Sequence, residues 1–223
     1  MNSRTIRAAL FDLDGVVVFT DRYHYLAWKR LADDRGWAFD EAVNEGCKGV
    51  PRMASLEVIL RHNGLDLSAE EKESMADRKN EDYVAALSAI SDDDIVPGAR
   101  SFLETLHAAG LPLALCSSSR NARMVLQALQ LDRLFAATVT GHDIARPKPD
   151  PEIFLRGAEL LKVEPSVCVV FEDAASGVAA ARAAGMRCIG VGSPDALPEA
   201  DAWIHNFCDP RLDNILVEIG ARG

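Results

Sequence analysis

Two carboxylates lie two residues apart near the start of the chain, in Ala8-Ala9-Leu10-Phe11-Asp12-Leu13-Asp14-Gly15. The apolar run predicts a buried strand, and side chains at i and i+2 of an extended segment point the same way, so Asp12 and Asp14 should face one small site. Crowded carboxylates repel unless a cation or a proton holds them, and Mg²⁺ prefers oxygen ligands. One carboxylate could then attack phosphorus to give an aspartyl phosphate while the other moves the proton. A plain turn after a strand is the competing interpretation.

Two more predicted strands end in polar residues. Residues 113–116 precede Ser117-Ser118-Ser119, and residues 167–171 precede Glu172-Asp173. The carboxyl ends of parallel strands share one edge of the sheet, so the fold would bring these residues to Asp12. Lys148 lies among three prolines in residues 146–151, which restrict its backbone. A fixed lysine, a serine hydroxyl and a bound cation stabilise phosphoryl transfer, so this convergence favours a catalytic site over ordinary loop composition.

The elements that must position these residues alternate beyond residue 92. Short apolar runs predict strands at 113–116, 136–140, 167–171 and 188–191, and amphipathic segments predict helices at about 99–110, 121–131, 151–161 and 176–184. This alternation predicts an α/β class with a Rossmann-like parallel sheet covered on both faces. The segment after Gly192 is expected to be less regular, with Trp203 and His205 covering an edge.

Residues 16–92 show helical periodicity and no convincing buried strand, so we expect an inserted helical cap domain. Residues 21–35 predict one helix, and Ser68-Ala69-Glu70-Glu71 is a capping box that should open another reaching about residue 87. The predicted domains are therefore a catalytic core of residues 1–15 and 93–223 and a cap of residues 16–92. An insert directly after the first strand suits a lid above its acidic end.

Composition excludes several classes of protein. The chain has 223 residues, 48% of them hydrophobic and 26% charged, and no apolar run approaches the roughly 20 residues of a membrane span. A net charge of −10 without long basic runs argues against a nucleic-acid partner. The five cysteines are odd in number and widely spaced, which fits reduced thiols. We expect a cytoplasmic protein, because no signal peptide precedes the first strand, and a monomer with no membrane partner.

In order and spacing, Phe11-Asp12-Leu13-Asp14-Gly15, the serine turn, Lys148-Pro149 and Glu172-Asp173 resemble the four signature motifs of the haloacid dehalogenase superfamily. The resemblance covers nearly the whole chain. The insert resembles that of the β-phosphoglucomutase group, which carries like residues at the positions of His24, Trp28, Lys48-Gly49-Val50-x-Arg52 and Arg78-Lys79-Asn80. Superfamily phosphatases usually lack this Lys-Gly-x-x-Arg arrangement, so the cap favours a mutase.

The resemblance implies a role for each matching residue. Asp12 would be the phosphorylated nucleophile and Asp14 the general acid and base, with Ser117 and Lys148 on the transferring phosphoryl group. Mg²⁺ would be held by Asp12, the Asp14 carbonyl and Asp173, with Glu172 beside the metal. Sugar, distal phosphate and cap closure would involve the remaining site residues, which are Thr20, His24, Trp28, Lys48, Gly49, Val50, Arg52, Lys79, Ser119, Arg120 and Asn121.

The implied activity is a Mg²⁺-dependent mutase that interconverts β-glucose 1-phosphate and glucose 6-phosphate through an aspartyl-phosphate enzyme and glucose 1,6-bisphosphate. A sugar-phosphate phosphatase on the same core and a noncatalytic sugar-phosphate sensor are the alternatives, although retention of Asp12 and Asp14 argues against the sensor. The chain departs from the family pattern at Phe19, Pro51, Arg120 and Ala174. Arginine at position 120 offers a planar fork where the family has a lysine, which could shift phosphate or sugar preference.

Overall fold

The computed structural model describes residues 5–47 and 50–218, and the chain divides into two compact units. One unit comprises Met1–Phe19 and Ser91–Gly223, and the other comprises Thr20–Ile90. The first division therefore falls after Phe19 and not, as expected, after residue 15. The cause is local: Val18 forms a bridge with Ile95, and the Val96 N–H donates to the Val17 carbonyl at 3.0 Å, so residues 16–18 stay with the α/β unit.

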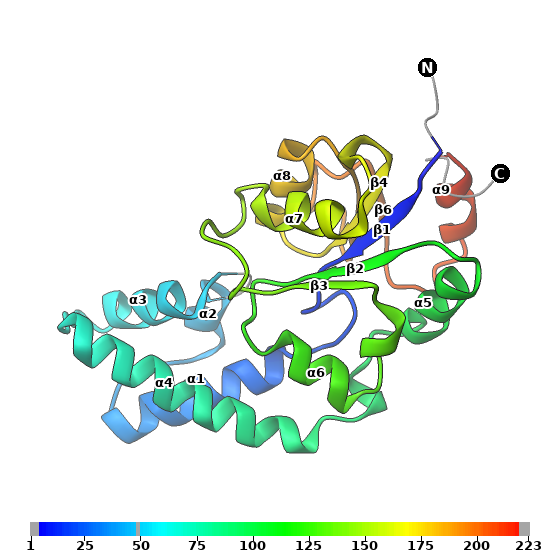
Figure 1. The fold of residues 1–223 in the computed structure, drawn as a ribbon. Coiled ribbons are helices and arrows are strands. Elements are labelled where there is room, and N and C mark those ends of the chain that lie inside the picture. The colour runs from blue at the N-terminus through cyan, green and yellow to red at the C-terminus, as the bar shows by residue number, and fades with distance from the viewer. Residues whose placement is uncertain (1–4, 48–49, 219–223) are drawn as a thin grey trace. The chain divides into compact units, whose positions relative to one another are not determined.

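A six-stranded sheet forms the centre of the α/β unit (Figure 1). Its strands are β1 (Ala8–Phe11), β2 (Leu113–Cys116), β3 (Ala137–Val139), β4 (Cys168–Glu172), β5 (Arg187–Val191) and β6 (Ala202–Ile204). They lie in the order β3-β2-β1-β4-β5-β6, and every neighbouring pair is parallel. This is a doubly wound order, and the predicted α/β, Rossmann-like class is confirmed.

Helices cover both faces of this sheet. Figure 1 shows α7 (Glu152–Leu161) and α8 (Ala175–Ala183) over one face, with α5 (Ala99–Ala108) and α6 (Ala122–Ala128) over the other. Helix α6 is shorter than the predicted 121–131, because the chain turns at Gln130, whose φ is 54°. Short 3₁₀ turns at Leu87–Ala89, Asp92–Asp94, Asp132–Leu134 and Pro165–Val167 complete the connections.

The C-terminal segment is more regular than expected. It supplies β6, which makes Trp203 part of the edge strand, and α9 (Leu212–Glu218). A strand of only three residues, two of them half-buried, carries too little alternation to be recognised from sequence.

Strand alternation decides which side chains meet on each face. Leu10 and Val170 belong to the apolar core that includes Phe154 of α7 and Val178 of α8. Phe11 and Phe171 point the other way, and their rings stack at 4.7 Å within a cluster that includes Phe102 of α5. Asp12 and Glu172 follow Leu10 and Val170 by two residues. Period-two geometry therefore returns both acids to the face covered by α7 and α8.

The second unit is helical. Its helices are α1 (Asp21–Arg35), α2 (Glu41–Glu45), α3 (Arg52–His62) and α4 (Ala69–Ala86). They bury an apolar core that includes Trp28, Leu31, Leu56, Ile59 and Met75. Helix α1 has the predicted limits and ends at Gly36, whose φ of 68° suits glycine. The predicted capping box is formed, since Ser68 and Glu71 each satisfy a backbone N–H of the other. No helix among the described residues is long and apolar enough to cross a membrane.

Candidate active site

The carboxyl edge of the sheet brings Asp12, Ser117 and Glu172 together from β1, β2 and β4. Residues Phe11 and Phe171 are paired in register, and the Asp12 N–H donates to the Phe171 carbonyl at 3.0 Å. All three polar residues are buried, with exposed fractions of 7% for Asp12, 0% for Ser117 and 1% for Glu172. Buried carboxylates must be paired or protonated to offset the loss of hydration, and a cation between them would provide the pairing.

Lys148 supplies that cation. Its Nζ lies 2.5 Å from Asp12 Oδ1 and 2.5 Å from Glu172 Oε1, and 4.9 Å from the centre of the Phe154 ring. Burial alone would lower the pKa of Lys148, but the two carboxylates outweigh it and hold that pKa above its ordinary value. Burial raises the pKa of Glu172, against the attraction of Lys148. The lysine therefore stays charged and lies directly against the Asp12 carboxylate.

Asp14 lies in the turn that follows β1 rather than in the strand itself. The strand ends at Phe11, and the Leu13 carbonyl accepts from the N–H groups of Val16, Val17 and Val18. Gly15 has a φ of 78°, and a Cβ built on it would lie 2.0 Å from Asp173 Oδ2. The Asp173 carboxylate thus packs against the backbone of the turn that carries Asp14, which only a glycine permits.

The oxygen donors of this edge fit a hard divalent cation such as Mg²⁺. Asp12 and Asp173 offer carboxylates from adjacent strands, and Asp173 occupies the space that a side chain at Gly15 would fill. The two oxygens of Glu172, which is expected beside the metal, accept from Lys148 and from the Ala174 N–H. Within the described part of the chain, no three acidic, histidine or cysteine side chains are gathered closely enough to enclose a metal ion.

The serine turn after β2 is internally hydrogen-bonded. Ser117 Oγ accepts from the Ser119 N–H at 3.1 Å, and Ser119 Oγ accepts from the Asn121 N–H at 3.3 Å. Since each hydroxyl also carries a donor proton, both serines retain a group suited to a phosphate oxygen. The loop after β3 packs closely on this turn, because a Cβ on Gly141 would lie 2.4 Å from the Ser118 carbonyl oxygen. Arg120 is exposed.

The helical unit holds a second cluster of predicted residues. Lys79 in α4 is 3% exposed, and its Nζ lies 2.7 Å from His24 Nδ1. The ammonium also faces the rings of Trp28 and Tyr83 at 5.0 and 4.8 Å. An ammonium can only donate, so His24 Nδ1 must accept and the imidazole proton lies on Nε2. Burial, then the charges of Lys79 and Arg52, hold the pKa of His24 well below its ordinary value.

Arg52 begins α3 and donates to Asn80 Oδ1 at 2.8 Å, with Asp77 at 3.8 Å. The predicted site residues do not include Asn80 and Tyr83. The position of Asn80 beside Lys79 was visible in the sequence, whereas nothing local indicated that the Tyr83 ring stacks on His24 at 4.1 Å.

Trp28, which the resemblance places among the substrate-binding residues, lies in the apolar core of the helical unit. Its side chain is 2% exposed, and its ring faces the Lys79 ammonium, so a contact between Trp28 and substrate stays a prediction. Thr20, at the start of α1, is also fully buried. Val50 is 39% exposed, and the predicted Lys48 and Gly49 lie outside the described residues.

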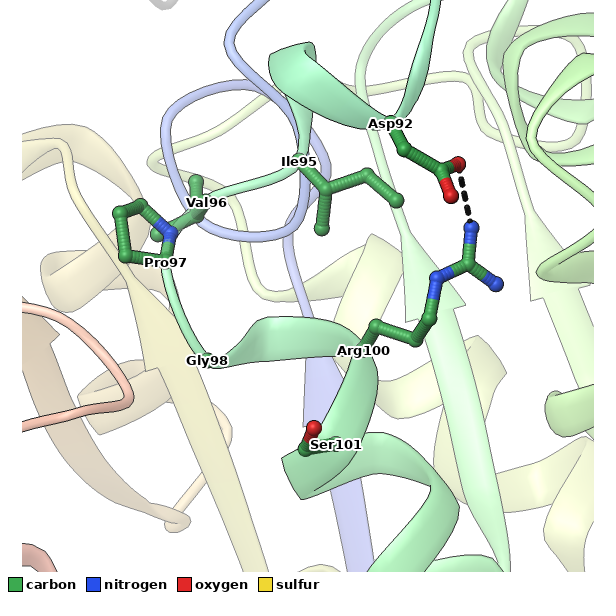
Figure 2. A pocket seen from close by; sticks show the side chains of 7 residues that line it. All are labelled: Asp92, Ile95, Val96, Pro97, Gly98, Arg100 and Ser101. Carbon is green, nitrogen blue, oxygen red and sulfur yellow. Dashed lines mark hydrogen bonds and ion pairs between the residues drawn. The ribbon is translucent and has the colours of Figure 1, made fainter.

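A separate cavity of about 250 Å³ lies where the chain enters α5, and Figure 2 shows its lining from Asp92 to Ser101. Arg100 pairs there with Asp92 at 2.7 Å and donates to the Leu129 carbonyl at 3.0 Å. The cavity shares no residue with the carboxylate edge, so it is distinct from the candidate active site.

The fold and the carboxylate edge define a class of phosphoryl-transfer proteins, and comparison with known proteins agrees. Residues 6–185 match the family model for haloacid dehalogenase-like hydrolases, and the chain belongs to this family. It is 39% identical over 210 residues to β-phosphoglucomutase from Bacillus subtilis, and this match covers 93% of this chain and 93% of the relative. It is also 33% identical over 184 residues to a phosphorylated carbohydrates phosphatase from Thermotoga maritima, covering 82% of this chain and 83% of the relative.

A solved structure shows the same relationship. The crystal structure of β-phosphoglucomutase from Clostridium difficile is similar to this chain with a TM-score of 0.90 and 36% identity, over 96% of this chain and 97% of the other. The expected superfamily and its β-phosphoglucomutase-like character are therefore confirmed.

Proposed function

We propose that this protein is a Mg²⁺-dependent sugar-phosphate mutase that interconverts β-glucose 1-phosphate and glucose 6-phosphate. The observation that carries the proposal is the buried Asp12–Lys148–Glu172 arrangement at the ends of β1 and β4. The similarity to two β-phosphoglucomutases over nearly the whole chain supports the choice of substrate. The α/β unit would be the catalytic domain and the helical unit the substrate-binding cap.

Asp12 would be the nucleophile. In one half-reaction the 6-hydroxyl of β-glucose 1-phosphate would attack the phosphorus of phosphorylated Asp12 while the Asp12–phosphorus bond breaks and Asp14 takes the hydroxyl proton, so glucose 1,6-bisphosphate and free Asp12 form. The bisphosphate would then reorient in the site. In the other half-reaction an Asp12 oxygen would attack the phosphorus of the 1-phosphate while the sugar oxygen departs and receives a proton from Asp14, so glucose 6-phosphate and the aspartyl phosphate form.

Lys148 and Ser117 would act on the transferring phosphoryl group. The ammonium already lies against Asp12, which places a fixed positive charge where charge develops on the phosphoryl oxygens. Mg²⁺, held by Asp12, Asp173 and the Asp14 carbonyl, would supply further neutralisation of that charge. Ser119, Arg120 and Asn121 would bind sugar or the phosphate that is not transferred.

In the helical unit, Arg52 and the Nε2–H of His24 are the proposed contacts to the sugar phosphate. Arg52 carries the planar fork that suits bidentate phosphate recognition, and Asn80 orients it. The Lys79 ammonium holds His24 in its neutral donor form.

A phosphatase on the same core is the second candidate, favoured by the similarity to the phosphorylated carbohydrates phosphatase. It would form the same aspartyl phosphate but pass the phosphoryl group to water. The two candidates therefore differ only in the acceptor.

A paired assay distinguishes them. Purified protein is supplied with Mg²⁺, β-glucose 1-phosphate and a trace of glucose 1,6-bisphosphate, and glucose 6-phosphate and inorganic phosphate are followed together. Glucose 6-phosphate without matching phosphate release supports the mutase. Phosphate release alone supports the phosphatase, and neither product from any sugar phosphate refutes both.

We also propose a cytoplasmic monomer. All five cysteines are free, which suits a reducing compartment. Gel filtration with light scattering tests the oligomeric state directly.

A further inference from the structure

Gly177 is an unusual residue for its position. It lies inside α8, only two residues after that helix begins at Ala175, and its φ is not in the left-handed region. Alanine is the better helix former at such a position, so glycine carries a stability cost that backbone conformation does not explain.

The neighbouring side chain explains it. A Cβ built on Gly177 would lie 1.8 Å from Glu172 Oε1, 1.9 Å from Cδ and 2.5 Å from Oε2. These are the three nearest atoms, and all belong to one carboxylate. The Glu172 carboxylate therefore occupies the place where every other residue type would put its Cβ.

The same carboxylate leads to the proposed nucleophile. Its Oε2 accepts from the Ala174 N–H at 2.9 Å, and its Oε1 accepts from Lys148 Nζ at 2.5 Å. The Lys148 ammonium in turn contacts Asp12 Oδ1 at 2.5 Å. Glu172 is 1% exposed, so it has no solvent-filled space into which it could retreat.

We infer that Gly177 is a positioning residue for phosphoryl transfer, because its bare Cα lets Glu172 sit where it holds Lys148 against Asp12. Gly177 itself touches no substrate atom in this inference. The inference rests on the proposed function for its catalytic consequence, but its structural part, the coupling between positions 177 and 172, is independent of the reaction.

Adding one methyl group tests the inference. Gly177→Ala should lower kcat for phosphoryl transfer by about tenfold or more, since small displacements of catalytic groups carry losses of that size. Ser176→Ala, one residue away in the same helix, is the matched control because it adds no atom, and its kcat should match that of the wild type.

A double-mutant cycle separates positioning from simple damage to the helix. Glu172→Asp withdraws the carboxylate by one methylene, and Glu172→Ala removes it. In the wild type, which keeps Glu172, Gly177→Ala should lower the Tm. In both Glu172 variants the same substitution should lower the Tm by less, or should raise it. In the Glu172→Asp background, it should also cause a smaller proportional loss of kcat.

An equal loss of Tm in all three backgrounds, or an unchanged kcat for Gly177→Ala beside Glu172, would overturn the inference. If the wild-type protein transfers no phosphoryl group, the proposed function and the catalytic role of Gly177 fail. The Tm cycle still decides separately whether Gly177 positions Glu172.

Discussion

At the scale of single residues, the site depends on a few charges that are held in one state by their neighbours. Lys148 stays charged because two carboxylates bind it and outweigh the effect of burial. Burial and then the positive charges of Lys79 and Arg52 hold the pKa of His24 well below its ordinary value, so His24 is neutral.

Asp12→Asn tests the nucleophile. The amide keeps the size and one acceptor oxygen of the carboxylate, so the contact with Lys148 can survive, but the side chain no longer attacks phosphorus. We expect no phosphoenzyme and a fall in turnover of about 10³-fold or more, at nearly unchanged Tm. Intact-mass measurement after exposure to a sugar bisphosphate checks this, and a variant still phosphorylated at residue 12 would contradict the assignment.

His24 predicts a dependence of stability on pH. Its pKa in the folded protein lies well below the ordinary value of 6.5, so the unfolded chain binds a proton first as the pH falls. This contribution to stability is complete above about pH 6.5 and is lost as the pH falls from there toward the folded pKa, by up to about 1.4 kcal/mol per pH unit.

The measurement is urea unfolding at pH 7.5 and at pH 5.5 for the wild type, His24→Gln and the exposed-histidine control His62→Gln. The wild type and the control should lose stability more steeply on acidification than His24→Gln. Equal slopes for all three proteins would show that His24 is not held neutral.

At the scale of elements, local signals determine where helices begin, and packing determines how strands are used. The Ser68–Glu71 capping box begins α4, the helix that carries Lys79 and Asn80. Gly157 is a residue of α7 and lets that helix approach the sheet closely, since a Cβ built on Gly157 would lie 2.7 Å from Cys116 Sγ of β2.

Ser68→Ala should therefore destabilise the helical unit. The substitution leaves a backbone N–H of the first turn without its side-chain acceptor, which costs about 0.5–2 kcal/mol. Ser74→Ala, at an exposed site within the same helix, should be neutral or slightly stabilising because alanine is the better helix former. Thermal unfolding followed by circular dichroism checks both, and equal Tm values for the two variants would argue against the cap.

At the scale of the whole molecule, a doubly wound sheet collects residues from distant parts of the sequence at one edge. Asp12 and Lys148 are 136 residues apart in the chain and in direct contact. The acidic balance of the protein, with a net charge of −10, is compatible with a phosphorylated substrate because the cation needed is placed locally.

Removal of metal should stop the reaction without unfolding the protein. Lys148 already pairs with Asp12 and Glu172, so the carboxylate edge does not depend on a metal for its main charge compensation. In EDTA we expect no turnover but a cooperative thermal transition, and added Mg²⁺ should restore turnover and raise the Tm by mass action. Full turnover in EDTA, or loss of the transition, would contradict this.

The sequence by itself determined the α/β class, the limits of α1 and β2, the capping box and the residue types at the strand ends. These features are local, since periodicity, caps and apolar runs are each contained in a few consecutive residues. Only the tertiary structure decided that Glu172 turns toward Lys148, that Trp28 is buried behind Lys79, that β6 forms an edge and that Gly177 makes room for a carboxylate. Each of these depends on how side chains or strands pack in three dimensions, which periodicity, caps and apolar runs do not encode.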